Sequence, residues 1–231
     1  MANTLRPILH IADTPEDVID KLAHFIRSTA DAAVARHGRF DIALSGGQTP
    51  RALYTLLAER HAETMPWQQT HFFFGDERYV PHDDPQSNAR MAAEAMLDRV
   101  PTPREQIHPM PTHHADPTDA ADEYEACLRQ HFSSRPPHFD LILLGIGPDG
   151  HTASLFPGSP VLEAREVLVA LVLVDPRDEV GGEVDDLLEL LGLELLARLD
   201  AGEQVREPRA RAAQVPDVHD GSGQLDVAHP V

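Results

Sequence analysis

Residues 139–158 read Phe-Asp-Leu-Ile-Leu-Leu-Gly-Ile-Gly-Pro-Asp-Gly-His-Thr-Ala-Ser-Leu-Phe-Pro-Gly. The apolar run at 139–144 is typical of a strand buried in a parallel sheet, and the glycines after it allow a sharp turn. Ligands of open α/β sheets bind just beyond the carboxyl ends of the strands. The loop therefore places the Asp149 carboxylate and the His151 imidazole where a ligand would lie. A histidine with an ordinary pKa of about 6.5 can take and return a proton at neutral pH.

The same loop also fits a dinucleotide-binding pattern, because Gly145, Gly147 and Gly150 have its spacing. That pattern needs a helix directly after the glycines, whose N-terminus meets the pyrophosphate. Pro157 and Gly158 stop any such helix within about two turns. We therefore expect no nicotinamide cofactor.

A second apolar run, at 41–44, leads into another loop and then into a helix-like run at 51–59. The loop consists of Ser45, Gly46, Gly47, Gln48, Thr49 and Pro50. Thr49 suits the N-cap of the helix and Pro50 its first turn. Two glycines and two hydroxyls at a helix N-terminus can cradle an anion with backbone N–H groups. An ordinary capped turn is the alternative interpretation.

A third apolar run, at 71–74, is followed by Gly75, Asp76, Glu77 and Arg78. Arg78 offers a planar fork that suits a phosphate or a carboxylate. Asp76 and Glu77 could hold Arg78, bind substrate hydroxyls or be solvated. Farther along, Ser87 and Asn88 are expected to cap a helix over about 86–98 or to form its entry turn.

The remaining pattern predicts a strand at 7–11, a helix at 15–36, a connector at 100–115 and a helix at 117–132. Strands that alternate with helices predict an α/β fold with a doubly wound, mostly parallel sheet and helices on both faces.

Taken together, the three loops resemble those of the 6-phosphogluconolactonases, within the glucosamine/galactosamine-6-phosphate isomerase-like superfamily. The order and spacing of the motifs agree over roughly residues 5–165. The resemblance implies a Rossmann-like fold and hydrolysis of 6-phospho-D-glucono-1,5-lactone to 6-phospho-D-gluconate, in the oxidative pentose phosphate pathway. It implies neither a metal nor an organic cofactor.

A related family, the glucosamine-6-phosphate deaminases, has a similar loop that carries a Glu before Pro-Gly. Phe156 holds that place here, and phenylalanine cannot move a proton. The substitution favours the lactonase. A deaminase-like protein, or a non-catalytic relative that only binds a phosphosugar, is the alternative.

Lactone hydrolysis requires an activated water and a proton for the leaving ring oxygen. We expect His151 to act as the general base and then to return the proton, as the resemblance also implies. Asp149 would orient His151 or favour its charged form. For the phosphate we expect Arg78, the N–H groups around Ser45, Gly46 and Gly47, and Thr49, with Asp76 as a further substrate contact. A capping His151 and a turn-forming Asp149 are the structural alternatives.

Composition limits the remaining possibilities. The chain has 231 residues and a formal net charge of −19, which argues against a nucleic-acid partner. Cys127 is the only cysteine, so no internal disulfide can form, as in a reducing cytoplasm. We expect neither a signal peptide nor a membrane-spanning run, and no metal site, since His113 and His114 lie in a Pro-rich connector. No oligomeric state is predicted.

The resemblance ends near Arg165. The family is expected to have a lysine near substrate in its last third, yet the only lysine here is Lys21. We therefore predict a lactonase α/β domain over 1–174 and a divergent acidic segment over 175–231, with a leucine-rich helix at 183–199 and a polar, disordered tail. Residues 161–231 contain 16 acidic and 6 basic residues. This segment is either a divergent region with another role, such as a partner contact, or the product of a shifted reading frame.

Overall fold

The computed structural model describes residues 8–133, 137–164, 167–174 and 190–195. Its helices and strands follow in the order α1 (Pro15–His37), β1 (Phe40–Leu44), α2 (Gln48–Arg60), β2 (Thr70–Phe74), β3 (Asp76–Arg78), α3 (Asn88–Ala92), α4 (Pro117–His131), β4 (Leu141–Ile142), β5 (Val169–Val174) and β6 (Leu190–Leu195). Short 3-10 turns lie at Trp67–Gln69, Arg104–Gln106 and Pro160–Glu163, and a π-helical turn at Ala93–Leu97 continues α3.

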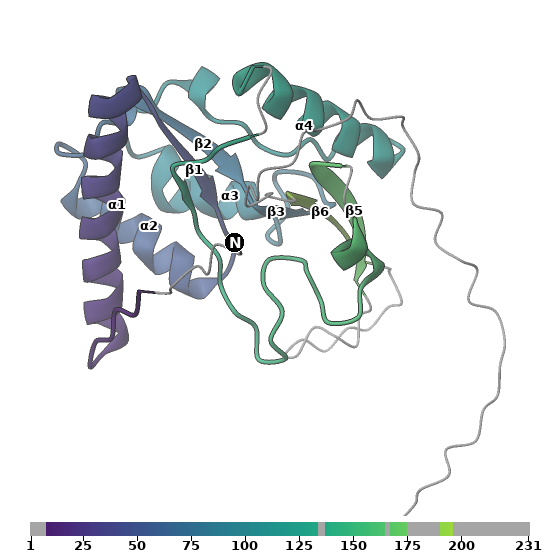
Figure 1. The fold of residues 1–231 in the computed structure, drawn as a ribbon, viewed down its shortest axis with the longest axis horizontal. Helices are drawn as coiled ribbons and strands as arrows, with labels where there is room; N and C mark the ends of the chain where they lie inside the picture. Colours follow the sequence, from purple (N-terminus) through teal and green to yellow (C-terminus); the bar gives the residue numbers. More distant parts are fainter. Residues whose placement is uncertain (1–7, 134–136, 165–166, 175–189, 196–231) are drawn as a thin grey trace, which may run out of the picture.

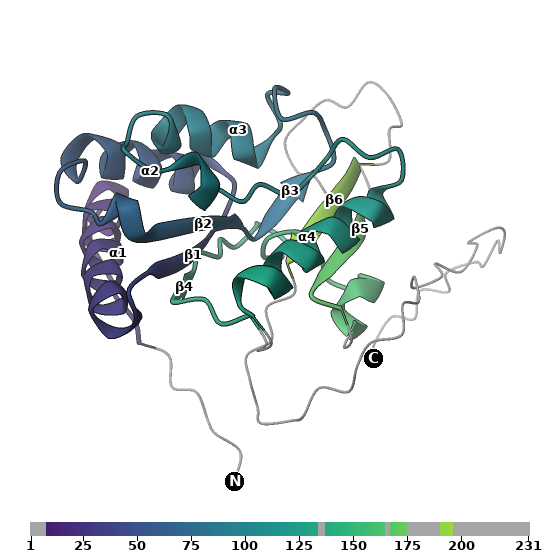
Figure 2. The same ribbon diagram turned by 90° about the horizontal axis from the view of Figure 1, so that it is seen from above.

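The described strands form two sheets. The first is parallel, in the order β2-β1-β4, and its register aligns Ala43 with Phe73 on one side and with Ile142 on the other. The second is antiparallel, in the order β3-β6-β5, and lies beside the carboxyl end of β2 (Figures 1 and 2). The predicted α/β class is confirmed, while the parallel part of the described chain is limited to three strands.

Helices cover both faces of the parallel sheet, as predicted. The α1 and α2 helices pack together on one face, and α4 lies on the other (Figure 2). The Tyr124 hydroxyl of α4 accepts a hydrogen bond from the Phe74 backbone N–H at 3.0 Å, which ties this helix to the end of β2. The buried core between these layers includes Phe40, Phe72 and Phe73.

The start of α2 differs from the prediction. Gly47, not Thr49, is its N-cap, and Gly47 has a φ of 100°. Glycine adopts positive φ without the steric cost that other residues meet, so the chain turns into the helix earlier than expected. Thr49 consequently lies inside the first turn and is exposed.

Two predicted strands are absent or shortened. Residues 8–11 form no regular structure, and Ile8 and Ile11 are more than 80% exposed, at 82% and 83%. The predicted strand at 139–145 is reduced to β4, which pairs with β1 and lies at the edge of the described sheet. A strand requires a neighbour for its backbone groups. Among the described strands β4 has one neighbour and residues 8–11 have none.

The helix predicted at 183–199 is wrong over 190–195, which form β6. Leu193 pairs with Glu77 of β3 on one side and with Leu171 of β5 on the other. Gly192 disfavours a helix at this place, and pairing with two strands outweighs the helical leucine pattern. The remainder of that prediction and the whole predicted polar tail, 200–231, lie outside the described residues. The division at 174 stays a prediction.

Candidate active site

Three hydrogen bonds join the predicted motif loops at the carboxyl ends of β1 and β2. The Gly75 N–H donates to the Leu44 carbonyl at 2.8 Å. The Asn88 side-chain amide donates to the Asp76 carbonyl at 3.0 Å, and the Ser154 hydroxyl donates to the Asp76 carboxylate at 3.2 Å. The loops whose sequences predicted a ligand site therefore lie together in space.

The Gly145–Gly158 loop orients one histidine. Asp149 Oδ1 accepts from the His151 backbone N–H at 3.2 Å and lies 2.5 Å from His151 Nδ1. These two hydrogen bonds hold the pKa of the Asp149 carboxyl below its ordinary value. With the Nδ1 proton directed at Asp149, the lone pair of the imidazole is on Nε2. The predicted pairing of Asp149 with His151 is therefore present in the structure.

Close packing fixes the position of that imidazole. A Cβ at Gly147 would lie 2.1 Å from His151 Cε1, so only a glycine leaves room for the ring. The Phe156 ring lies 4.6 Å from the imidazole, centre to centre, and the side chain of His151 remains 26% exposed. The histidine is thus held firmly yet remains accessible to water.

Asp76 links the histidine loop to the rest of the site. The residue is 6% exposed, and burial raises the pKa of its carboxyl, although the charges of Arg78 and His151 and the hydrogen bond from Ser154 oppose that rise. Its carboxylate accepts a hydrogen bond from Ser154, so Asp76 helps to hold the Gly145–Gly158 loop in place. Asp76 was predicted as a site residue from the sequence, whereas its partner Ser154 was not.

The neighbouring Glu77 has a structural role. It is fully buried, and its carboxylate accepts hydrogen bonds from the Arg78, Asn88 and Ala89 backbone N–H groups at 2.7–2.8 Å and from the Ser87 hydroxyl at 3.2 Å. Ser87 is the N-cap of α3, as expected. Glu77 therefore anchors the entry to α3, and of the three charged residues only Arg78 is left facing a cavity.

A cavity of about 290 Å³ lies at the N-termini of α2 and α3. Its lining includes three arginines, Arg51, Arg78 and Arg90, together with Gly47 and Asn88. The guanidinium of Arg90 pairs with Glu94 at 2.7 Å, whereas Arg51 and Arg78 form no ion pair within the described part of the chain. Glu94 also lines the cavity and offsets Arg90, so the other two arginines beside a helix N-terminus are the groups that favour an anion.

The other predicted phosphate-binding residues have different positions. Ser45 is buried, and its backbone N–H and carbonyl both bond to the Tyr54 hydroxyl, at 3.0 and 2.8 Å. Gly46 packs against Asn88, because a Cβ there would lie 2.0 Å from Asn88 Oδ1. Ser45, Gly46 and the exposed Thr49 are not among the residues that line the cavity.

Arg51, Arg90 and Tyr54 were not predicted from the sequence. A usable signal existed for the arginines, since each lies in the first turns of a helix that follows a motif loop. Tyr54 carried no such signal, because a tyrosine in an amphipathic helix is usually part of the core.

Two groups of histidines could hold a metal ion among the described residues: one is His71, His108 and His131, and the other is His113, His114 and Glu123. Neither group includes Asp149 or His151. None of the described helices has the length and hydropathy required to span a membrane.

The fold and the site together define an α/β protein with an arginine-lined cavity beside the carboxyl ends of parallel strands, the place where open α/β sheets bind ligands. The model of the family described as glucosamine-6-phosphate isomerases/6-phosphogluconolactonase matches residues 13–180, and the chain belongs to this family.

Several similar proteins carry the name 6-phosphogluconolactonase. A 6-phosphogluconolactonase of Synechocystis sp. is 44% identical over 170 residues, which cover 72% of this chain and 70% of the relative. One of Nostoc sp. is 45% identical over 157 residues, 67% of this chain and 64% of the relative, so that match spans slightly less than two thirds of it. The solved 6-phosphogluconolactonase of Trypanosoma cruzi superposes with a TM-score of 0.70 at 29% identity, over 82% of this chain and 74% of that chain. The predicted family is confirmed.

Proposed function

We propose that this chain is a carboxylic ester hydrolase that converts 6-phospho-D-glucono-1,5-lactone to 6-phospho-D-gluconate. The observation that carries the proposal is the hydrogen bond between Asp149 and His151 Nδ1, in a loop joined to an arginine-lined cavity. The names of its relatives support the same activity.

The reaction begins with a water molecule held by Nε2 of His151. As the water attacks the lactone carbonyl, Nε2 takes its proton, and the neighbouring Asp149 carboxylate stabilises the imidazolium that forms. The tetrahedral intermediate collapses when the bond to the ring oxygen breaks. The imidazolium then returns its proton to that oxygen, which leaves a hydroxyl on the open-chain acid and regenerates neutral His151.

The phosphate of the substrate binds in the cavity between Arg51 and Arg78. Charge-assisted bonds to phosphate are worth about 1.5–3 kcal/mol each, and arginine can form them in pairs. The overall charge of −19 repels an anionic substrate at long range, so the local arginines must supply the attraction. The Asp76–Ser154 hydrogen bond holds the Gly145–Gly158 loop, which carries His151, in position relative to this cavity.

We propose further that the protein acts in the cytoplasm on a freely diffusing phosphosugar lactone, without a nucleic-acid or membrane partner. Every proton transfer and substrate contact described above is made by a side chain or backbone group of the protein, without a cofactor. The single cysteine and the acidic composition agree with this setting.

A comparison of two substrates tests the proposal against the deaminase alternative. The purified chain is supplied with freshly generated lactone, and 6-phosphogluconate formation is compared with the spontaneous rate of a blank; in parallel, ammonia release from glucosamine 6-phosphate is measured. We expect hydrolysis above the blank and no ammonia, because Phe156 cannot move the protons of deamination. Ammonia release, or binding of 6-phosphogluconate without any hydrolysis, would contradict the proposal.

A further inference from the structure

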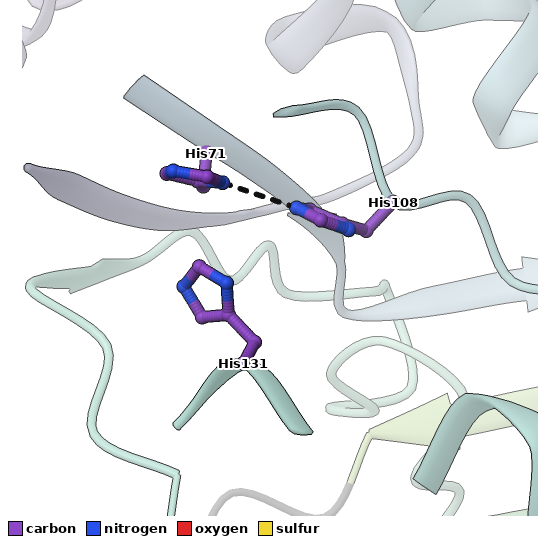
Figure 3. A group of neighbouring side chains, drawn as sticks. All are labelled: His71, His108 and His131. Atoms are coloured by element: carbon purple, nitrogen blue, oxygen red, sulfur yellow. Dashed lines mark hydrogen bonds between the residues drawn. The ribbon is translucent and has the colours of Figure 1, made fainter. Parts of the chain in front are cut away.

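Three histidines gather on the face of the parallel sheet that α4 covers (Figure 3). His71 is the second residue of β2, His108 follows the short turn at Arg104–Gln106, and His131 ends α4. A ring nitrogen from each lies within 4.8 Å of the other two, and all three residues are half-buried. Because they are far apart in the sequence, no motif reveals the group. It lies toward the amino end of β2, whereas the site above lies beyond its carboxyl end.

We propose that His71, His108 and His131 bind one divalent transition-metal ion, with Zn²⁺ as the best fit. His71 Nδ1 and His108 Nε2 are 3.2 Å apart. Two imidazole nitrogens that bind a tetrahedral zinc at 2.0–2.1 Å lie about 3.3–3.4 Å from each other. The spacing of this pair is therefore already close to that of a metal-bound pair, and a shift of about 1.5 Å or less would bring in the third ring.

Neighbouring groups occupy one ring nitrogen of His131 and one of His108, which leaves the other nitrogen of each ring to serve as a ligand. His131 Nε2 lies 2.8 Å from the carboxylate of Asp41, which leaves Nδ1 of that ring as the ligand atom. His108 Nδ1 lies 3.8 Å from the Cys127 sulfur, which leaves Nε2, the atom that faces His71. Metal-binding histidines usually donate their other ring N–H to a carboxylate, a carbonyl or water, which fixes the ring orientation, and His131 has such a partner in Asp41.

The protein supplies three ligand atoms and little negative charge at this place, so a bound cation would need a fourth ligand from solvent. Asp41 is buried and bonds to Arg39 at 2.8 Å, so its negative charge is largely offset. Three neutral imidazoles add no charge, and the Phe73 ring stacks on His108 at 4.3 Å. We therefore expect a water or hydroxide to complete a tetrahedral ion. Such an ion would clamp β2, the connector and α4 together without taking part in lactone hydrolysis.

The second histidine group provides a matched control. His114 Nε2 is already paired with Glu123 at 2.6 Å, and Glu123 is exposed. His113 is exposed as well, so this group has the same residue type, but His114 is its one half-buried member.

The test is a calorimetric titration of the untagged, metal-stripped chain with Zn²⁺, accompanied by visible spectra of the Co²⁺-loaded protein. We expect one tight site per chain, tetrahedral Co²⁺ absorption and a raised melting temperature on loading. His71→Gln and His131→Gln should each weaken Zn²⁺ binding by more than tenfold. The control variants His113→Gln/His114→Gln and His151→Gln should bind Zn²⁺ as the wild type does.

Each other result would overturn the proposal. These are the absence of a tight site in the wild type, loss of binding in either control, and full binding in both His71→Gln and His131→Gln. If those two variants do not fold, anomalous scattering from wild-type crystals soaked in Zn²⁺ decides the matter. A peak between the three rings supports the site, and a peak elsewhere or no peak refutes it.

Discussion

The His151 imidazole occupies the space that a side chain on Gly147 would need, since a Cβ at that position would lie only 2.1 Å from Cε1 of the ring. The φ of Gly147 lies outside the left-handed region, so the requirement for glycine comes from contact with the histidine rather than from the backbone conformation. The loop glycine and the proposed base therefore form one unit.

Replacing Gly147 with alanine should displace the imidazole while leaving the fold intact. A misplacement of about 1 Å can cost roughly 100-fold in rate, so we expect kcat to fall by about that factor with little change in KM. Gly145→Ala is the matched control, because a Cβ there meets no atom within 4 Å. Steady-state kinetics on both variants provide the check, and equal losses in the two would contradict the packing argument.

Arg78 is expected to act on binding. Arg78→Gln should raise KM for the lactone by about 10- to 100-fold, because one charge-assisted contact worth about 1.5–3 kcal/mol is lost. Arg90→Gln should have a smaller effect, since that guanidinium is already paired with Glu94. The two variants are compared by KM and by inhibition with 6-phosphogluconate; the reverse order would remove Arg78 from the phosphate site.

The buried hydroxyl of Tyr54 should matter for the stability of the fold. Tyr54→Phe leaves the N–H and the carbonyl of Ser45 without the hydroxyl that bonds to both. An unsatisfied buried group costs about 1–3 kcal/mol, so the free energy of unfolding should fall by that order. Denaturant titration measures the free energy of unfolding. Tyr79→Phe, whose hydroxyl bonds to a single carbonyl, that of His114 in the connector, serves as the comparison. An unchanged unfolding free energy in Tyr54→Phe would show that water replaces the hydroxyl.

The buried carboxyl of Asp76 makes stability depend on pH. Burial raises its pKa above the ordinary 3.8, so the folded chain holds this proton to higher pH than the unfolded chain does. Folding loses stability from this group as pH rises from the unfolded pKa through the folded one. Asn has no such titration, so the stability of Asp76→Asn relative to the wild type should increase as pH rises from about 4 through this window. Denaturant melts at a series of pH values test the sign; a flat difference would contradict it.

The positions of helices and strands could be predicted from the sequence where neighbouring residues determine them. The α1 helix follows its Thr14 cap, Pro15 and Gly38, and the strands at 40–44 and 70–74 follow their apolar runs. The family and the Asp149–His151 pair were likewise visible, because the residues that carry them are close together in one loop.

Features that depend on distant neighbours could not be predicted in the same way. Within the described ranges, the short β4 pairs with one strand and residues 8–11 pair with none, and their own composition does not reveal this. The β6 strand contradicted a helical leucine pattern for the same reason. Arg51 and Arg90 reach one cavity from two helices, and only the fold brings them to Arg78.

If His151 is the base in lactone hydrolysis, its loss should abolish most of the activity, which is measured as the hydrolysis rate of wild type and of His151→Gln beside a no-enzyme blank. We expect a wild-type rate well above the blank and a loss of about 100- to 10,000-fold in the variant, with an unchanged thermal shift on adding 6-phosphogluconate. A variant that keeps the wild-type rate, or a wild type that does not exceed the blank, would contradict it.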